Sequence, residues 1–164
     1  MITPQAQAIE KLFYIQDKNG NKVPFVLNPS QRAFDEQRKH CRKQLITKAR
    51  QKGFSAYILA LYAIECMGHE GTKAVVISHE GDATQRLLNR VHYYLKHMNG
   101  PKPVLGRHSR NELYFPKTES TFYIGTAGSR AFGRGDTITH LHISEYAWWG
   151  EDALKHVAGL WQAV

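Results

Sequence analysis

Residues 73–78 read Lys-Ala-Val-Val-Ile-Ser, a mostly β-branched run without the polar alternation of a half-exposed strand. Such a run is typical of a strand that is covered on both faces, as in a parallel sheet. Further strands are predicted at 121–125 and 137–144, and the apolar residues of 54–67 and 82–98 predict helices. Because strands alternate with helices, we expect an α/β sandwich with a mostly parallel sheet.

The part of the chain before this α/β pattern is expected to contain a β-hairpin. Two short apolar runs within 13–27 flank Asn19-Gly20, which supplies the positive φ angles of a tight turn. Pro24 lacks an N–H group, so the second arm is predicted to be an edge strand. Asn28 is a good N-cap and predicts a helix over 29–42. Further elements are expected as strands at 44–48 and 112–115 and as a last helix at 151–163.

Composition narrows the class of protein. The chain has 164 residues, with 22 Lys and Arg against 14 Asp and Glu, so its formal net charge is +8. An apolar content of 42% excludes a disordered chain, and the length predicts one domain. The longest near-apolar stretch, 56–67, is shorter than the about 20 residues of a membrane span. The amino terminus has no basic segment followed by an apolar run, so we expect no secretory signal. Two cysteines exclude a disulfide scaffold and suit a reducing cytosol.

The loop at 48–55, Lys-Ala-Arg-Gln-Lys-Gly-Phe-Ser, lies between a predicted strand and a predicted helix. A phosphate-binding loop in this place normally reads GxxxxGK[ST]. Gly53 and Ser55 hold their places in this pattern, whereas Lys48 replaces the first glycine and Phe54 replaces the lysine. The loop is therefore a deviant form of the motif.

The chemistry of phosphate binding is still available in this loop. Lys48 can approach the phosphates from the start of the loop, and Arg50 adds a second positive charge. Ser55 places a hydroxyl at the helix start, where Mg²⁺ and the helix dipole both favour it. The alternative is a basic strand-to-helix turn in which Ser55 acts only as a cap.

A predicted strand that ends in an acid provides the second motif, His140-Leu141-His142-Ile143-Ser144-Glu145. P-loop nucleotide hydrolases place a Walker B carboxylate at this point, where a glutamate orients or deprotonates the attacking water. Glu145 takes that role here, and Ser144 stands where the metal-supporting aspartate is usual. The alternative is that Glu145 caps the following segment.

Two other segments fit a nucleotide site. The Gln31 amide can both donate and accept, which suits an adenine edge, although with Asn28 it also forms a capping-box pattern. Arg134 lies between two glycines, which suits an arginine finger that crosses a subunit boundary. Arg134 equally suits binding of a DNA phosphate, or an exposed turn.

The ordered set of motifs resembles the ATPase domain of the large terminase subunit of tailed bacteriophages, the motor that pumps DNA into a procapsid. LNPSQRAF (27–34) looks like the adenine-binding segment of that family, and KARQKGFS (48–55) is similar to its deviant Walker A motif. TAGSRAFGRGDTITHLHISEYAWW (126–149) looks like the segment that leads into Walker B. The resemblance covers about residues 13–161.

This resemblance implies an ASCE-type P-loop NTPase with an αβα core that binds ATP and Mg²⁺. The implied partners are double-stranded DNA, the small terminase subunit, the portal protein and further copies in a ring, in the cytoplasm of an infected bacterium. Glu145 and Arg134 would be catalytic, with Arg130 as the alternative arginine, and Ser55 and Ser144 would lie near the metal. The implied nucleotide-binding residues are Asn28, Gln31, Lys48, Arg50, Gln51, Gly53, Phe54 and Ser55.

Terminase large subunits continue beyond Walker B into a coupling motif, the rest of the sheet and an RNase H-like nuclease domain. Residues 1–164 are therefore predicted to be the N-terminal part of such an ATPase domain, and hence a fragment. The alternatives are a helicase-like P-loop ATPase and a non-catalytic DNA-binding or assembly module. The motor predicts nucleotide binding that depends on Lys48, whereas the module predicts salt-sensitive DNA binding that is indifferent to ATP.

Overall fold

The computed structural model describes residues 2–47, 52–127 and 137–150, together with Lys155, Val157 and Gly159, which are helical. The chain divides into two compact units. The first unit comprises Met1–Ile64 and Arg90–Lys102, and the second comprises Glu65–Asn89 and Pro103–Val164. Among the described residues, no helix combines the length and the apolar character that crossing a membrane requires.

The first unit begins with a helix that the sequence patterns above do not predict, α1 (Pro4–Leu12). The Thr3 side chain accepts a hydrogen bond from the Ala6 N–H, and Pro4 occupies the first helical position. Ala6 and Ile9, one turn apart, are fully buried. The Thr-Pro start and this apolar pair are the signal from which the helix could have been predicted.

The predicted β-hairpin is confirmed as β1 (Tyr14–Gln16) paired antiparallel with β2 (Lys22–Pro24). Gly20 has φ +83° in the turn, which explains why glycine is needed there. The Asp17 carboxylate accepts hydrogen bonds from the N–H groups of Asn19 and Asn21. These bonds, with Asn21 contributing most, lower the pKa of Asp17.

Helix α2 (Pro29–Gln37) starts at Asn28 as predicted but ends five residues before the predicted end at 42. Residues 39–43 are exposed and polar, so a longer helix would bury no apolar face and would gain no packing energy. The prediction of a strand at 44–48 is wrong for 44–47, which form no strand. Leu45 is 90% exposed there, and a strand needs both a partner edge and a covered face.

A buried carboxylate joins three parts of the first unit. Asp35 is fully buried and accepts hydrogen bonds from the Thr3 N–H (2.6 Å) and Oγ1 (2.8 Å). It also accepts bonds from Arg38 Nε (2.9 Å) and from the Tyr57 hydroxyl (2.6 Å). Burial raises the pKa of Asp35, but the bonds from Tyr57, Thr3 and Arg38 lower it more, so it lies below its ordinary value. This network ties α2 to the start of α1 and to Tyr57.

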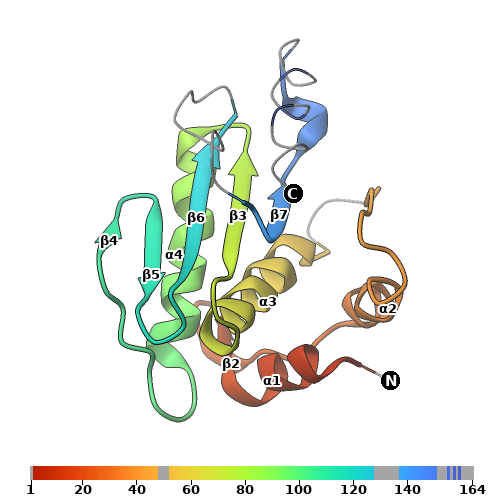
Figure 1. Ribbon diagram of the computed structural model, residues 1–164. Coiled ribbons are helices and arrows are strands. Elements are labelled where there is room, and N and C mark those ends of the chain that lie inside the picture. Colours follow the sequence, from red (N-terminus) through yellow and green to blue (C-terminus); the bar gives the residue numbers. More distant parts are fainter. Residues whose placement is uncertain are drawn as a thin grey trace. The chain divides into compact units, whose positions relative to one another are not determined.

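The second unit is built on a five-stranded sheet in the order β4-β5-β6-β3-β7 (Figure 1). Strand β3 (Lys73–Ser78) pairs in parallel with β6 (Ser120–Thr126) and with β7 (His140–Ile143). Strands β4 (His108–Ser109) and β5 (Glu112–Phe115) add an antiparallel edge. The α/β class is confirmed, and the sheet is mixed rather than mostly parallel.

The other predicted elements lie close to their expected bounds. The structure has helices α3 (Phe54–Gly68) and α4 (Gly81–His97), and the predicted strands at 73–78 and 112–115 are confirmed. Strand β7 begins three residues after its predicted start at 137 and is followed by a short 3₁₀ helix, η1 (Tyr146–Trp148). In β3 every residue after Lys73 is buried, as its β-branched run predicts.

Candidate functional site

The start of α3 carries the described part of the predicted phosphate loop. Gly53 has φ +72°, a backbone conformation that favours glycine, and its carbonyl accepts the Tyr57 N–H at 3.0 Å. Phe54 is the first residue of α3, and Ser55 follows in the first turn. The hydroxyl therefore lies at a helix N-terminus, where unpaired N–H groups and the helix dipole favour an anion.

Gln31 and Asn28 form the capping box that the sequence allowed. Asn28 Oδ1 accepts the Gln31 N–H, and Gln31 Oε1 accepts the Asn28 N–H, both at 2.9 Å. The two side-chain amides also donate to the loop before α3: Gln31 Nε2 to the Gly53 carbonyl (2.8 Å) and Asn28 Nδ2 to the Lys52 carbonyl (3.2 Å). Gln31 is 4% exposed with both ends of its amide engaged, so adenine binding by Gln31 stays a prediction that requires these bonds to rearrange.

The cationic residues of the predicted site lie outside the described residues. These are Lys48 and Arg50 of the phosphate loop, with Gln51 beside them, and the two candidate finger arginines, Arg130 and Arg134. Their assignments stay predictions from the sequence.

The second unit presents a carboxylate at the end of β7. Glu145 follows this strand and adopts φ 56°, ψ 41°, a left-handed conformation that is uncommon for any residue other than glycine. Although Glu145 is the N-cap of η1, its side chain makes no capping hydrogen bond, so the capping alternative is wrong. The side chain is 53% exposed. A carboxylate at the carboxyl end of a parallel strand is available to a ligand.

The backbone on either side of this carboxylate is held firmly. Ser144 is buried, and its N–H donates to the Ile77 carbonyl at 2.7 Å. The Ser144 carbonyl accepts the indole N–H of Trp149 at 3.2 Å, and Trp149 packs against a cluster around Val75 and Ile77. Ser144 is therefore fixed between β3 and Trp149, and it supplies no carboxylate.

Sequence reasoning missed His79, which contacts Glu145. His79 directly follows β3, and its Nδ1 lies 3.1 Å from Glu145 Oε2. Its other ring nitrogen, Nε2, lies 3.9 Å from Glu80 Oε2. The signal was present in the sequence, because a histidine next to a buried strand lies at the same carboxyl edge as Glu145 when the two strands are parallel neighbours.

Each of the two units, taken by itself, carries an oxygen donor of the kind that magnesium accepts. No group of three or more His, Cys, Asp or Glu that could hold a metal occurs within the residues that the structure describes. Mg²⁺ prefers oxygen ligands and usually combines one or two protein oxygens with waters and substrate phosphates. The hydroxyl of Ser55 in the first unit and the carboxylate of Glu145 in the second are such oxygens.

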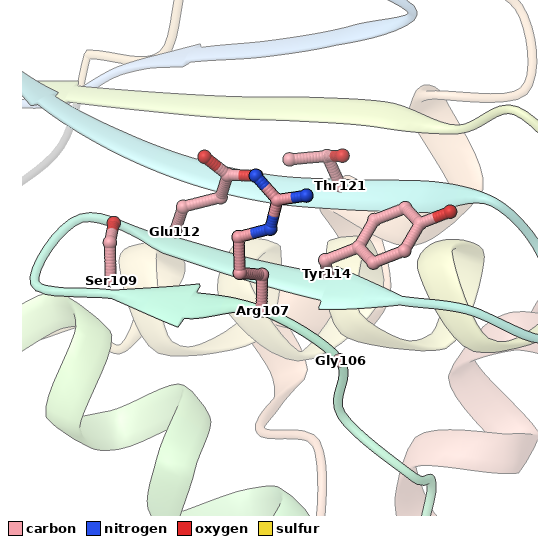
Figure 2. A pocket seen from close by; sticks show the side chains of 6 residues that line it. All are labelled: Gly106, Arg107, Ser109, Glu112, Tyr114 and Thr121. Atoms are coloured by element: carbon pink, nitrogen blue, oxygen red, sulfur yellow. The ribbon is translucent and has the colours of Figure 1, made fainter.

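A groove of about 610 Å³ forms a separate concave feature over β4, β5 and β6. Figure 2 shows the side chains of Arg107, Glu112 and Tyr114 on the same face of the sheet. The groove is lined by Gly106, Arg107, Ser109, Glu112, Tyr114 and Thr121. It contains none of the residues that the sequence predicts for the nucleotide site. Thr121 lies at the amino end of β6, whereas Glu145 follows the carboxyl end of β7.

A scan against protein-family models finds no match to this chain, and a search of curated proteins finds no significant match. The assignment of a function therefore depends on the residues and their geometry.

Proposed function

We propose that this chain is the ATP-binding and ATP-hydrolysing part of a viral DNA-packaging motor of the terminase type. The observation that carries the proposal is the placement of Glu145. An exposed carboxylate follows the parallel strand next to β3, on a left-handed backbone, and it caps no helix. Glu119 also has a positive φ (49°), so the backbone conformation supports a chemical role for Glu145 only together with its exposed position at the end of a parallel strand.

The loop before α3 supports the nucleotide part of the proposal. Gly53 has the positive φ that a phosphate-binding loop needs, and Ser55 lies in the first turn of α3. Lys48 and Arg50 supply positive charge within eight residues of the sequence. Cations and helix N–H groups together are the usual means of binding a polyphosphate.

In the proposed reaction, water would attack the γ-phosphoryl group of ATP; the bond to the β-phosphate oxygen would break, and ADP and inorganic phosphate would be released. Lys48 and Arg50 would hold the phosphates and neutralise their charge, and the Ser55 hydroxyl would offer an oxygen to Mg²⁺, which would supply further neutralisation of the phosphate charge. Glu145 orients the attacking water and accepts its proton. Arg134, from a neighbouring copy, would stabilise the charge of the transition state. Double-stranded DNA is the polyanion to which the net charge of +8 would bind.

The test is binding of Mg²⁺-ATP by calorimetry, with turnover measured on the same proteins. Lys48→Ala should abolish binding, whereas Lys18→Ala, which removes an exposed lysine in the hairpin turn, should leave it unchanged. Glu145→Gln should retain binding and lose turnover, because the carboxamide keeps the shape of the side chain but is not a base.

Turnover that survives in both Lys48→Ala and Glu145→Gln contradicts the site assignment. Binding of DNA with a steep salt dependence, but without any ATP binding, favours the non-catalytic DNA-binding module.

A further inference from the structure

The contact between His79 and Glu145 joins the ends of two neighbouring strands of the second unit, β3 and β7. We propose that His79 is a positioning residue that fixes the carboxylate of Glu145 for its reaction with water. This inference rests on the proposed function, because it assigns a role toward the catalytic glutamate. His79 itself touches neither the nucleotide nor the water in this proposal.

The sheet brings the two side chains together. Ile77 of β3 is in register with Ile143 of β7, so His79 and Glu145 each follow two residues after a paired position. The Ser144 N–H donates to the Ile77 carbonyl at 2.7 Å, which extends the ladder to the residue before Glu145. On the other side, the Ala127 N–H donates to the Ser78 carbonyl at 2.8 Å. The backbones on both sides of the contact are therefore held by ladder hydrogen bonds.

The His79 ring is better held than the carboxylate that it contacts. Its side chain is 27% exposed, against 53% for that of Glu145. The ring lies between two carboxylates, with Nδ1 at 3.1 Å from Glu145 Oε2 and Nε2 at 3.9 Å from Glu80 Oε2. Each ring nitrogen therefore has its own carboxylate neighbour. A 180° rotation of the ring would take both nitrogens away from these neighbours, so one ring orientation is favoured.

The contact engages one oxygen of the Glu145 carboxylate, Oε2. A glutamate has several rotatable bonds, and an exposed one without a partner samples many rotamers. Contact of Oε2 with His79 selects rotamers in which Oε1 keeps a fixed direction. Because general-base catalysis depends on placing the base within hydrogen-bond reach of the water, loss of this restraint should lower the rate of the chemical step.

The position of Nδ1 allows a test with near-isosteric variants. An asparagine side chain places its amide nitrogen close to the position of a histidine Nδ1, whereas glutamine places it close to Nε2. The contact is an ion pair at 3.1 Å and is not a hydrogen bond. Only His79→Asn can therefore keep a polar nitrogen close to the place of Nδ1 beside Glu145. His79→Ala removes the contact, and His79→Gln keeps an amide in the wrong place.

The first arm of the experiment measures kcat and KM for ATP. His79→Ala and His79→Gln should lower kcat about 10- to 100-fold with KM nearly unchanged, and His79→Asn should restore most of kcat. The matched control is His69→Ala, which removes a histidine that directly follows α3 and pairs with Glu65 at 2.7 Å. This control should keep its kcat. An unchanged or raised kcat in His79→Ala, or equal rescue by glutamine and asparagine, overturns the proposal.

The second arm needs no turnover and measures the nitrogen NMR shifts of the imidazole rings. Glu145→Gln should move the Nδ1 resonance of His79 and leave that of His69 in place. An unmoved His79 resonance shows that the contact is absent and overturns the proposal. If ATP binding does not depend on Lys48, the proposed function itself is wrong. If binding and turnover depend on Lys48 but do not change when His79 is replaced, only the positioning role of His79 is wrong.

Discussion

Replacing Gly53 by alanine tests whether the start of α3 is held against α2 in the way that the structure indicates. Gly53 has φ +72°, and a Cβ atom added to it would lie 2.8 Å from Gln31 Nε2. That nitrogen donates to the carbonyl of Gly53 itself. An alanine therefore meets two separate obstacles, a strained backbone and a side chain that must move.

The two obstacles have different sizes. A left-handed backbone costs a residue with a Cβ about 1–2 kcal/mol. Displacing Gln31 breaks its bond to the Gly53 carbonyl, which contributes about 1 kcal/mol. The Gly53→Ala variant should therefore lose about 2–3 kcal/mol of the free energy of unfolding, which for a typical urea dependence lowers the midpoint by about 1 M.

The assay is urea unfolding followed by far-ultraviolet circular dichroism, together with Mg²⁺-ATP binding. Gly20→Ala is the matched control, because Gly20 has φ +83° in the same unit but nothing within 4 Å of an added Cβ. It should lose only the about 1–2 kcal/mol of backbone strain. In a Gln31→Ala background the extra loss at Gly53 should disappear, so the two substitutions should not be additive.

Two results would refute this reasoning. If Gly53→Ala costs no more than Gly20→Ala, the Gln31 contact does not restrain the loop. If the losses from Gly53→Ala and Gln31→Ala simply add, the two residues are not coupled.

Three further predictions concern other parts of the chain. Burial raises the pKa of Asp35, but the four hydrogen bonds that this carboxylate accepts lower the pKa more. The folded pKa therefore lies below the unfolded pKa. Asp35 stabilises the fold at pH values above the unfolded pKa, and this stabilisation is lost as the pH falls through the folded pKa. Urea midpoints measured from neutral to acidic pH should therefore fall more steeply for the wild type than for Asp35→Asn. Burial raises the pKa of the Cys66 thiol to about 12, whereas Cys41 is exposed, so a thiol reagent should modify one cysteine quickly in the native protein and both in denaturant. Glu145→Asn should abolish turnover and raise the free energy of unfolding by about 0.5–1 kcal/mol, because asparagine tolerates the left-handed conformation better; a loss of stability on urea unfolding would contradict this.

The fold of the second unit could be predicted where a strong local pattern coincided with burial. The β-branched run at 73–78 predicts a strand that is covered on both faces. The structure has β3 with these same bounds and with a parallel neighbour on each side. The antiparallel edge could not be predicted from its own residues, because pairing direction depends on the connection and not on strand composition. The short strand β4, of two residues, carries too little pattern to be detected at all.

The wrong and missed predictions of secondary structure in the first unit have a different cause. Gln44–Thr47 contains β-formers, but a strand also needs a partner edge, and no local pattern can report its absence. The helix over 29–42 was predicted too long because the polar residues after Gln37 have adequate helix propensity but no surface to bury. Helix α1 was missed although Thr3 and Pro4 mark its start.

Of the candidate site, the structure tests only the local placement of single residues. Gly53 and Ser55 lie at the start of a helix, although 44–47 form no strand before the loop, and Glu145 follows a parallel strand. The capping box of Asn28 and Gln31 forms as its spacing indicates. His79 was missed because its importance depends on the order of strands in the sheet. A histidine after β3 can contact Glu145 only if β7 is the neighbour of β3 in the sheet, and sequence periodicity does not determine which strands are neighbours.

The conformation of Glu145 bears most directly on whether this site is functional. A glutamate on a left-handed backbone costs about 1–2 kcal/mol relative to a residue that adopts this conformation freely. A residue that served only to end β7 would regain that energy by substitution with glycine or asparagine. The side chain recovers little of the cost structurally, because it caps nothing in η1 and its contact with His79 is partly exposed. Strained backbone conformations of this kind are concentrated at functional sites, where the position of a side chain is retained for function although it lowers stability. The Glu145 carboxylate lies 3.1 Å from Nδ1 of His79, which follows β3. This contact and the left-handed backbone, more than the match to a Walker B pattern, are why we propose Glu145 as the catalytic residue.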